Sequence, residues 1–531
     1  MLSGQCAFSE ESPISTIAAI LHKQPKPLRQ IAPGVPTALE SIVTRCMEKN
    51  PSARFASMTE LKKALKELGQ HSVQPAEAAS IAVLPFENHS ADKEDEYFSD
   101  GLAEEILIAL SRVEGLRVTA RGSSFWFKGK SVEMSEIAAK LHVAHILDGS
   151  VRRAGNRVRV TVQLVDPHTG FPLWSERYDR QMEDIFEVQD EIARAIADQL
   201  KVTFGVAVKQ ATKNVEAYDL YLKGRHLSNQ RSPATMRQAI QLYEQAIRLD
   251  PEFALAYSGL SECYGVLLVN GWISAQEAGP PALAAMTKAV AIAPNLWEVI
   301  FSRGFYTFYF GRNWRDAGPD FEKAAECNPQ SSLAHGYLAI FYAMCQRTDE
   351  VIAQAAQACK LDPVSPFIHG LMSSAFQLLG MYDKAEIYAR KALDLQPSYV
   401  LGMFNLGLAL FSLGRNPEAI EVFEQVVAIS RAPAFVGHLG YAYHRAGRAE
   451  DASRLLRELE ERRSRGEYVP AWSFLIIYLG AGNAPEIRRT FSESIEQSCP
   501  ALNLRWADVS YGSALRTDPE INSVFVEILG Y

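Results

Sequence analysis

The sequence predicts a multidomain protein: a short helical segment, then a mixed α/β domain, then an all-α superhelical solenoid. Three observations lead to this prediction. A polar stretch separates residues 1–67 from the rest, strand-like and helix-like stretches alternate over residues 81–204, and alanine and proline recur at a nearly constant spacing after residue 211. Alternating strands and helices are typical of α/β domains, whereas a fixed period of a few tens of residues indicates stacked helical units.

The bulk composition is that of a folded chain and disfavours several classes of protein. Of 531 residues, 47% are hydrophobic and 22% are charged, and the net charge is −8. This acidic balance argues against nucleic acid as the main partner. The sequence has no long apolar run, and its first residues lack the basic-then-apolar order of a signal peptide. With seven unpatterned cysteines, these features favour a cytoplasmic protein with no membrane or nucleic-acid partner.

Residues 68–80 are small and polar and predict a linker, after which the α/β domain begins. The hairpin of this domain turns at Ala154-Gly155-Asn156, because glycine and asparagine supply the positive φ of a tight turn. The expected elements are a buried strand over 81–86, a helix over 96–112, a strand over 116–120, a helix over 133–142, the hairpin over 144–166 and a long helix over 182–203. These elements predict a compact domain with a mixed sheet.

Residues 211–465 contain a repeat. Prolines fall at 251, 294, 329, 363 and 397, so the successive gaps are 43, 35, 34 and 34 residues. Alanine precedes each proline by five residues and usually occurs again seven residues earlier. The set is Ala239, Ala246, Pro251, Ala289, Pro294, Ala324, Pro329, Ala358, Pro363, Ala385, Ala392 and Pro397. Small residues let neighbouring helices approach closely, and proline ends one helix before the next begins.

The pattern resembles the tetratricopeptide repeat family. The resemblance implies about six or seven helix pairs over 211–465, which build a right-handed superhelix, and further helices over 466–531 that cover its end. The first gap implies about nine inserted residues, GWISAQEAG over 271–279. The family also implies a groove for a protein or peptide, with Asn405 at a position where some arrays hold a peptide carboxylate. The lysines and the second asparagine that such a clamp needs are not evident, so a clamp is disfavoured. The aromatic stretch 301–310 is expected to lie mostly in the core.

Residues 1–67 resemble the closing helices of a eukaryotic-like serine/threonine protein kinase. MLSGQCAF at the start and RCMEKNPSARFAS over 45–57 carry the resemblance, with Pro51 and Arg54 in the expected order. In that family the arginine at the Arg54 position pairs with a buried glutamate, which here would lie before Met1. The resemblance therefore implies the truncated end of a catalytic lobe.

The sequence lacks the motifs that hold ATP and magnesium in kinases. It has no G-x-G-x-x-G loop, no V-A-I-K lysine, no H-R-D and no D-F-G, and its A-P-E at 484–486 has none of the usual neighbours. We expect no catalytic, metal-binding or cofactor-binding residue in this chain. ATP and magnesium would belong only to a complete parent kinase.

The stretch from IAVLPFENHS (81–90) to DIFEVQDEIARAIA (184–197) resembles the TolB-like α/β domain. In bacterial signalling proteins this domain is joined to tetratricopeptide repeats and carries a kinase, an adenylate cyclase or a DNA-binding head in front. The implied order in the complete protein is kinase, TolB-like domain, repeat array.

Two stretches of the α/β domain suggest a site at first sight. GSSFWFKGKS over 122–131 has the wrong glycine spacing for a P-loop and predicts a surface loop anchored by Phe125 and Trp126. His142 and His145 lack a third metal ligand, so a structural role is favoured.

Two charged groups are likewise expected to be structural. Arg152, Arg153, Arg157 and Arg159 surround the hairpin tip and predict a solvated face with local ion pairs. Asp100, Glu104 and Glu105 are expected near the start of an exposed helix, where carboxylates favour the helix dipole.

The favoured function is that of a cytoplasmic signalling protein which binds a protein or peptide in the repeat groove, as the regulatory part of a serine/threonine protein kinase. One alternative is a kinase whose catalytic core is missing here, and the chain is then inactive as it stands. A second alternative is the tail of a transcriptional regulator, which we disfavour because residues 1–70 lack a basic recognition helix.

Overall fold

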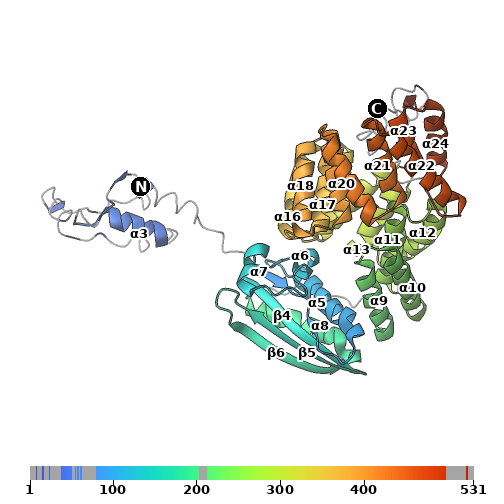
Figure 1. Cartoon of the computed structure of the whole chain (residues 1–531). Helices are drawn as coiled ribbons and strands as arrows, with labels where there is room; N and C mark the ends of the chain where they lie inside the picture. Colours follow the sequence, from blue (N-terminus) through green and yellow to red (C-terminus); the bar gives the residue numbers. More distant parts are fainter. Residues whose placement is uncertain are drawn as a thin grey trace. The chain divides into compact units, whose positions relative to one another are not determined.

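The computed structural model describes residues 37–50, 79–202, 212–311 and 313–497, with isolated residues between 8 and 62 and between 519 and 523. The chain separates into two compact units, residues 1–78 and residues 79–531 (Figure 1). The α/β domain and the helical array therefore belong to one unit, although the change of sequence pattern predicts two domains.

The first unit contains helix α3 (Thr37–Cys46). Arg45 donates to Glu60 at 2.9 Å, and Arg54 Nε donates to the Glu48 carbonyl oxygen at 2.7 Å. Arg54 is exposed. Pro51 lies outside the described residues.

The second unit begins with a mixed six-stranded sheet, as predicted. Its strands are β1 (Ser80–Val83), β2 (Glu87–Asn88), β3 (Arg117–Val118), β4 (His145–Ala154), β5 (Arg157–Val165) and β6 (Pro172–Gln181). The order is β3-β1-β4-β5-β6, and β2 also pairs with β4. Pairing is parallel around β1 and antiparallel from β4 to β6. Strand β3 is thus an edge strand, and its outer backbone groups need partners from elsewhere.

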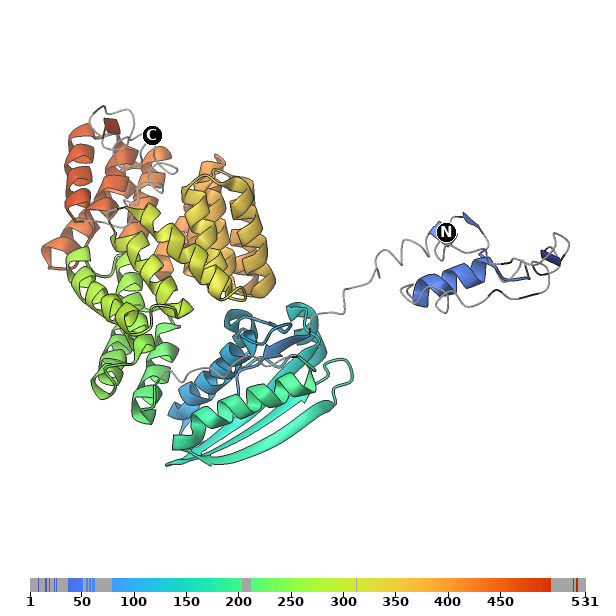
Figure 2. The same ribbon diagram turned by 180° about the vertical axis from the view of Figure 1, so that it is seen from behind.

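Helices of the α/β domain cover both faces of this sheet. They are α5 (Glu96–Ser111), α6 (Arg121–Phe125), α7 (Met134–Leu141) and α8 (Ile185–Gln199), with short 3-10 turns η2 (Lys93–Asp95) and η3 (Met182–Asp184). Figures 1 and 2 show α5 and α8 side by side on the sheet. Phe98, Leu102 and Ile106 on α5 are almost fully buried against the sheet and α8.

Strand β6 and helix α6 are absent from the sequence prediction. Only Tyr178 of the ten residues of β6 is buried, so the strand lacks the apolar alternation that marks a half-buried strand. Helix α6 lies within the stretch predicted as a surface loop, and that prediction is wrong, because Ser123 and Ser124 are fully buried.

Residues 212–497, where described, form helices and no strand. Seven antiparallel pairs come first: α9 (Val215–Ser228) and α10 (Pro233–Leu249), α11 (Ala254–Val269) and α12 (Ala275–Ile292), α13 (Trp297–Phe310) and α14 (Gly318–Cys327) with η4 (Trp314–Ala317), α15 (Ser332–Met344) and α16 (Thr348–Leu361), α17 (Pro366–Leu378) and α18 (Tyr382–Leu395), α19 (Val400–Ser412) and α20 (Asn416–Ile429), α21 (Pro433–Arg445) and α22 (Ala449–Ser464). Helices α23 (Ala471–Ala481) and α24 (Ala484–Glu496) follow. None of the described helices is both long and apolar enough to cross a membrane.

The repeated alanines lie where the two helices of a pair meet. All seven of the predicted set, Ala239, Ala246, Ala289, Ala324, Ala358, Ala385 and Ala392, have an exposed fraction of 0%. The prolines lie in the turns that follow: Pro251, Pro294, Pro329 and Pro397 are exposed and Pro363 is half-buried. The inserted stretch 271–279 forms a turn and then the first residues of α12, which Ser274 caps.

Two glycines of the array give a direct test of the packing, because one lies in a close contact and the other has room for a side chain. A Cβ atom on Gly407 of α19 would lie 2.5 Å from the Phe423 ring, whereas one on Gly279 of α12 would find no atom closer than 3.7 Å. We predict that Gly407→Ala lowers the free energy of unfolding by about 1–3 kcal/mol.

Gly279→Ala is the matched control and should change stability by less than about 1 kcal/mol, because the higher helix propensity of alanine is offset by the restriction that Pro280 places on the residue before it. Urea unfolding followed by circular dichroism measures both changes. Equal effects of the two substitutions would contradict the packing described for α19 and α20.

Candidate functional site

Two groups of hydrogen bonds and ion pairs join the α/β domain to the array. In the first, which we call the helix junction, α5 and the tip of the β4–β5 hairpin meet Asp219, Leu222, Arg225 and His226 of α9. In the second, the turn junction, residues 118–126 meet the turns that follow α14, α16 and α18. The α/β domain thus reaches from the first helix pair to the fifth.

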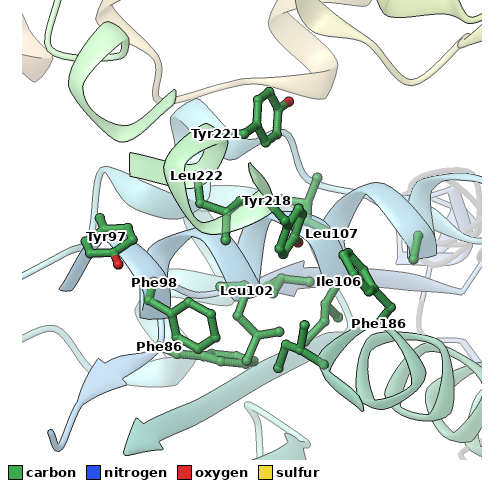
Figure 3. Packing of buried hydrophobic residues seen from close by; sticks show 14 of the residues in the cluster. Phe86, Tyr97, Phe98, Leu102, Ile106, Leu107, Phe186, Tyr218, Tyr221 and Leu222 are labelled. Carbon is green, nitrogen blue, oxygen red and sulfur yellow. The ribbon is translucent and has the colours of Figure 1, made fainter. Parts of the chain in front are cut away.

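The apolar part of the helix junction is continuous with the core of the α/β domain. Figure 3 shows Tyr218 and Leu222 of α9 above Leu102, Ile106 and Leu107 of α5. A Cβ atom on Gly101 would lie 2.9 Å from Leu222, so α9 rests directly on the α5 backbone. Tyr218 also packs on Phe186 of α8, with ring centroids 4.6 Å apart. One hydrophobic core therefore extends from the sheet into the first repeats.

Asp100 is buried in the helix junction rather than placed on an exposed helix as the sequence predicts. Its exposed fraction is 3%, and its carboxylate accepts from Lys128 Nζ at 2.6 and 2.7 Å and lies 3.3 Å from His226 Nδ1. Burial alone would raise the pKa of Asp100, but the hydrogen bonds from His226 and Lys128 hold it below its usual value. The carboxylate is a structural anion.

Glu104 and Glu105 surround an arginine of the array. Arg225 lies 2.8 Å from Glu105 and 3.4 Å from Glu104, and Arg121 donates to Glu104 at 2.8 Å. The Arg225 side chain is 13% exposed. Loss of one partner from such a buried group leaves an uncompensated charge and costs about 3–5 kcal/mol. These two glutamates therefore join α5 to α9 through Arg225.

The hairpin arginines divide into two sets. Arg153 donates to Asp219 at 2.8 Å and to the Tyr97 hydroxyl oxygen at 3.1 Å, so it joins the α/β domain to α9. Arg159 pairs locally with Asp179 at 2.6 Å, as a solvated face would. Two adjoining hollows of 540 and 480 Å³ share Glu94, Tyr97 and Lys223 beside this contact. Their linings mix acidic and basic side chains and favour no ion.

Gln330 covers the open edge of the sheet at the turn junction. Its amide oxygen accepts from the Val118 backbone N–H at 2.7 Å. Its amide nitrogen donates to the carbonyl oxygens of Ser111 and Leu116 at 2.9 and 2.8 Å. One side chain therefore satisfies three backbone groups of edge strand β3 and its connection to α5.

Asp362 supplies the cap that α6 lacks. The residue before α6, Ala120, has no capping side chain. The Asp362 carboxylate instead lies at the first turn of α6, where a Cβ atom on Gly122 would be 2.5 Å from Asp362 Oδ2, and this oxygen accepts from Ser332 Oγ at 3.3 Å. Its exposed fraction is 4%, and burial raises its pKa, whereas the bonds from Ser123, Ser365 and Ser332 oppose that rise. A helix of the α/β domain is thus capped by a turn of the array.

Backbone bonds on both sides of this cap strengthen the turn junction. The Ala120 N–H donates to the Leu361 carbonyl oxygen at 3.0 Å, and the Val364 N–H donates to Ser123 Oγ at 2.9 Å. Trp126 Nε1 donates to the Leu395 carbonyl oxygen at 3.2 Å. The stretch that resembles a P-loop in composition is therefore a docking segment.

The remaining residues singled out in the sequence lie apart from these junctions. His145 Nδ1 is 3.3 Å from the Ser80 carbonyl oxygen, and His142 ends α7 in a left-handed conformation. The described residues contain no group of three side chains able to hold a metal ion.

Asn405 and the aromatic stretch 301–310 lie within the array. The Asn405 amide nitrogen donates to the Gly370 carbonyl oxygen and to Ser374 Oγ, at 2.8 and 3.0 Å, and its exposed fraction is 4%. Its amide donors therefore link α19 to α17. Phe301, Phe305 and Phe308 are buried in the core, while Tyr306 and Phe310 are half-buried.

No pattern in the sequence marks Gln330, Asp362 or Arg225 as a contact residue. Asp362 stands before Pro363 just as Asp250 stands before Pro251, and aspartate before proline is an ordinary turn signal. No local pattern distinguishes a turn that holds another domain from one that faces water.

Family models match two parts of the chain. A model described as HilA/YgeH-like transcriptional regulator, second domain, matches residues 77–195, and a tetratricopeptide repeat model matches residues 374–434. The helix pairs and the second match identify the array as tetratricopeptide repeats, which confirms that prediction.

Two curated proteins illustrate the range of relatives. The protein named "Putative adenylate cyclase 3" from Rhizobium meliloti (strain 1021) is 38% identical over 242 residues, which cover 44% of this chain and 40% of the relative. Transcriptional regulator HilA from Salmonella typhimurium is 24% identical over 223 residues, which cover 41% of this chain and 39% of the relative. The chain spans about two fifths of the length of these relatives.

Solved structures of repeat proteins are also similar. TTC0263, a thermophilic TPR protein of Thermus thermophilus, has a TM-score of 0.31 at 19% identity, covering 37% of this chain and 99% of that chain. YrrB, described as a TPR protein with an unusual peptide-binding site, has a TM-score of 0.24 at 21% identity, covering 37% of this chain and 96% of that chain.

The cap from Asp362 predicts an effect of substituting Gly122. A Cβ atom on Gly122 would lie 2.5 Å from Asp362 Oδ2, so Gly122→Ala should push the carboxylate away from α6 and weaken the turn junction by about 1–3 kcal/mol. Hydrogen exchange should become faster over residues 117–127 and remain slow in β4.

A double-mutant cycle controls this prediction. Asp362→Ala alone should also speed exchange over 117–127, because α6 loses its cap. The double substitution should cost less than the sum of the two, since no carboxylate remains to clash. Simple additivity would contradict the direct contact.

Glu298 predicts how stability depends on pH. It lies on the first turn of α13, 3.8 Å from Arg112 at the end of α5, and its Oε2 makes no hydrogen bond with any described residue. Burial raises the pKa of Glu298 to about 7, Arg112 and Arg225 oppose the rise, and Glu105 adds to it.

A raised pKa means that the folded chain binds a proton which the unfolded chain releases. The contribution of Glu298 to stability is therefore greatest at low pH and is lost between about pH 4.5 and 7. We predict that Glu298→Gln matches the wild type near pH 4.5 and melts at a higher temperature above pH 7. Glu216→Gln, at an exposed position of α9, should show no such divergence. A constant difference across the range would contradict the prediction.

Proposed function

We propose that this chain is the partner-recognising and coupling part of a bacterial signalling protein. The repeat array binds a protein or peptide, and the α/β domain transmits the structural change caused by binding to an effector. The observation that carries this proposal is the double attachment of the α/β domain, to α9 at one end and to the turn after α18 at the other. A partner that alters the curvature of the repeats must strain the contacts of both junctions, because both junctions belong to one packed unit.

The relatives support a shared recognition part used with different effectors. One of them is named "Putative adenylate cyclase 3" and the other is the transcriptional regulator HilA. For this chain we propose a serine/threonine protein kinase as the effector, on the resemblance of residues 1–67 to the closing helices of a kinase lobe. ATP and magnesium would act there, and the α/β domain would be of the TolB-like kind.

A transcriptional regulator is the second candidate, since the model that matches residues 77–195 describes a domain of such regulators. The net charge of −8 disfavours direct contact of this chain with DNA. In that case too, the chain described here would select the partner, and a separate segment would contact DNA.

The experiment uses the full chain as bait in a lysate of its source organism, with Gly122→Ala as a parallel bait. The proposal predicts that both baits retain the same protein. It also predicts that binding alters hydrogen exchange over residues 117–127 of the wild type, and that this change is reduced in Gly122→Ala. Retention of no specific protein would contradict recognition, and an unchanged α/β domain in the complex would contradict coupling.

A second measurement concerns the chemistry of the chain itself. We predict that the purified chain transfers no label from ATP to itself or to a protein substrate, because its sequence contains neither an H-R-D nor a D-F-G motif. A complete serine/threonine kinase under the same conditions is the positive control. Transfer that survives repeated purification would contradict the expectation.

A further inference from the structure

Arg231 occupies an unusual position in the turn between α9 and α10. Its φ is +51°, in the left-handed region that residues with side chains seldom adopt. Its N–H donates to the Ser228 carbonyl oxygen at 3.2 Å, and the residue is exposed. This conformation directs the side chain of the first repeat toward helices that come much later in the array.

The guanidinium group of Arg231 meets an aromatic cluster, which we define as Tyr309, Tyr337, Phe367 and Tyr399. The guanidinium carbon lies 4.2 Å from the centroid of the Phe367 ring. The positive charge of Arg231 also acts on Tyr337 and Tyr399, where it opposes the rise in pKa that burial causes. A cation over an aromatic face is attracted by the negative face of the ring.

The cluster is built by consecutive repeats. Tyr309 lies on α13, Tyr337 on α15, Phe367 on α17, and Tyr399 immediately precedes α19. Each of these is the first helix of its pair, so four neighbouring repeats each supply one ring. Tyr309, Phe367 and Tyr399 remain half-buried rather than closed off from solvent.

A carboxylate adds negative charge to the same place. Glu262 on α11 accepts from Ser302 Oγ at 2.5 Å. Burial raises the pKa of Glu262, whereas the bond from Ser302 and the nearby charge of Arg231 oppose that rise. Burial also raises the pKa of Tyr309, Tyr337 and Tyr399, so their hydroxyls keep their protons near neutral pH.

We propose that the aromatic cluster and Glu262 form a recognition site for an arginine side chain of the array's partner, and that Arg231 fills this site in the unbound chain. The inference rests on the proposed function, since it names the chemistry of the group that the array binds. A planar guanidinium can stack on Phe367 and bond to a tyrosine hydroxyl at once, which a lysine ammonium cannot do. The net charge of −8 suits a basic partner.

The test is a titration of the full chain with a fluorescein-labelled pentapeptide, Gly-Gly-Arg-Gly-Gly, followed by fluorescence anisotropy. Arg231→Gly is the main variant, because glycine keeps the positive φ of the turn while it removes the side chain. Arg231→Asn is the second variant, since asparagine also tolerates this conformation. Arg237→Ala, at an exposed position of α10, is the matched control.

The expected result is at least about tenfold tighter binding by both Arg231 variants than by the wild type and by Arg237→Ala. Adding Glu262→Gln to Arg231→Gly should remove about tenfold of that affinity, and a peptide with citrulline in place of arginine should not bind. Circular dichroism melts confirm that each variant is folded. A lysine peptide that binds as tightly as the arginine peptide would overturn the preference for a guanidinium.

Equal affinity of wild type, Arg231→Gly and Arg231→Asn would overturn the inference. Its failure is distinguishable from that of the proposed function. A cellular partner that binds the wild type and both Arg231 variants alike, with or without Glu262, leaves the proposed function standing and refutes the arginine site. Peptide binding that follows the expected order, with no cellular partner retained, supports the site and contradicts the proposed function.

Discussion

The contact between the Asp362 carboxylate and the first turn of α6 is the interaction on which the arrangement of residues 79–497 depends most. The carboxylate is buried, it belongs to a turn between two repeats, and it lies directly against the first turn of α6, a helix of a different domain. A buried carboxylate is costly unless its oxygens are hydrogen-bonded. The turn that follows α16 and the start of α6 therefore stabilise each other, and neither has the same stability alone.

The other contacts extend this mutual dependence along the array. Gln330 satisfies the edge of the sheet, Arg225 lies between two glutamates of α5, and the apolar core continues from α5 and α8 into α9. Repeats usually contact only their neighbours, so a solenoid bends easily along its length. Here a rigid α/β domain holds the first and fifth pairs at once, which limits that bending.

The sequence predicted the elements better than their contacts. The spacing of alanines and prolines indicated the helix pairs, because close packing of helices requires small residues at fixed positions. The apolar runs and Gly155 indicated most of the sheet. Strand β6 could not be found, because only Tyr178 along it is buried. Asp100 was predicted to be exposed to solvent, because no residue pattern in α5 indicates that α9 covers this side chain. The side chains that join the two domains are ordinary turn and helix residues until the fold brings them together.

Because the two junctions join them, the α/β domain and the first five helix pairs should unfold as one unit. Native-state hydrogen exchange in increasing urea measures this directly, through the opening free energies of peptides from β4, α9, α15 and α17. We expect these values to converge on one free energy with one dependence on urea. Separate free energies, with the sheet opening while α15 and α17 stay protected, would contradict it.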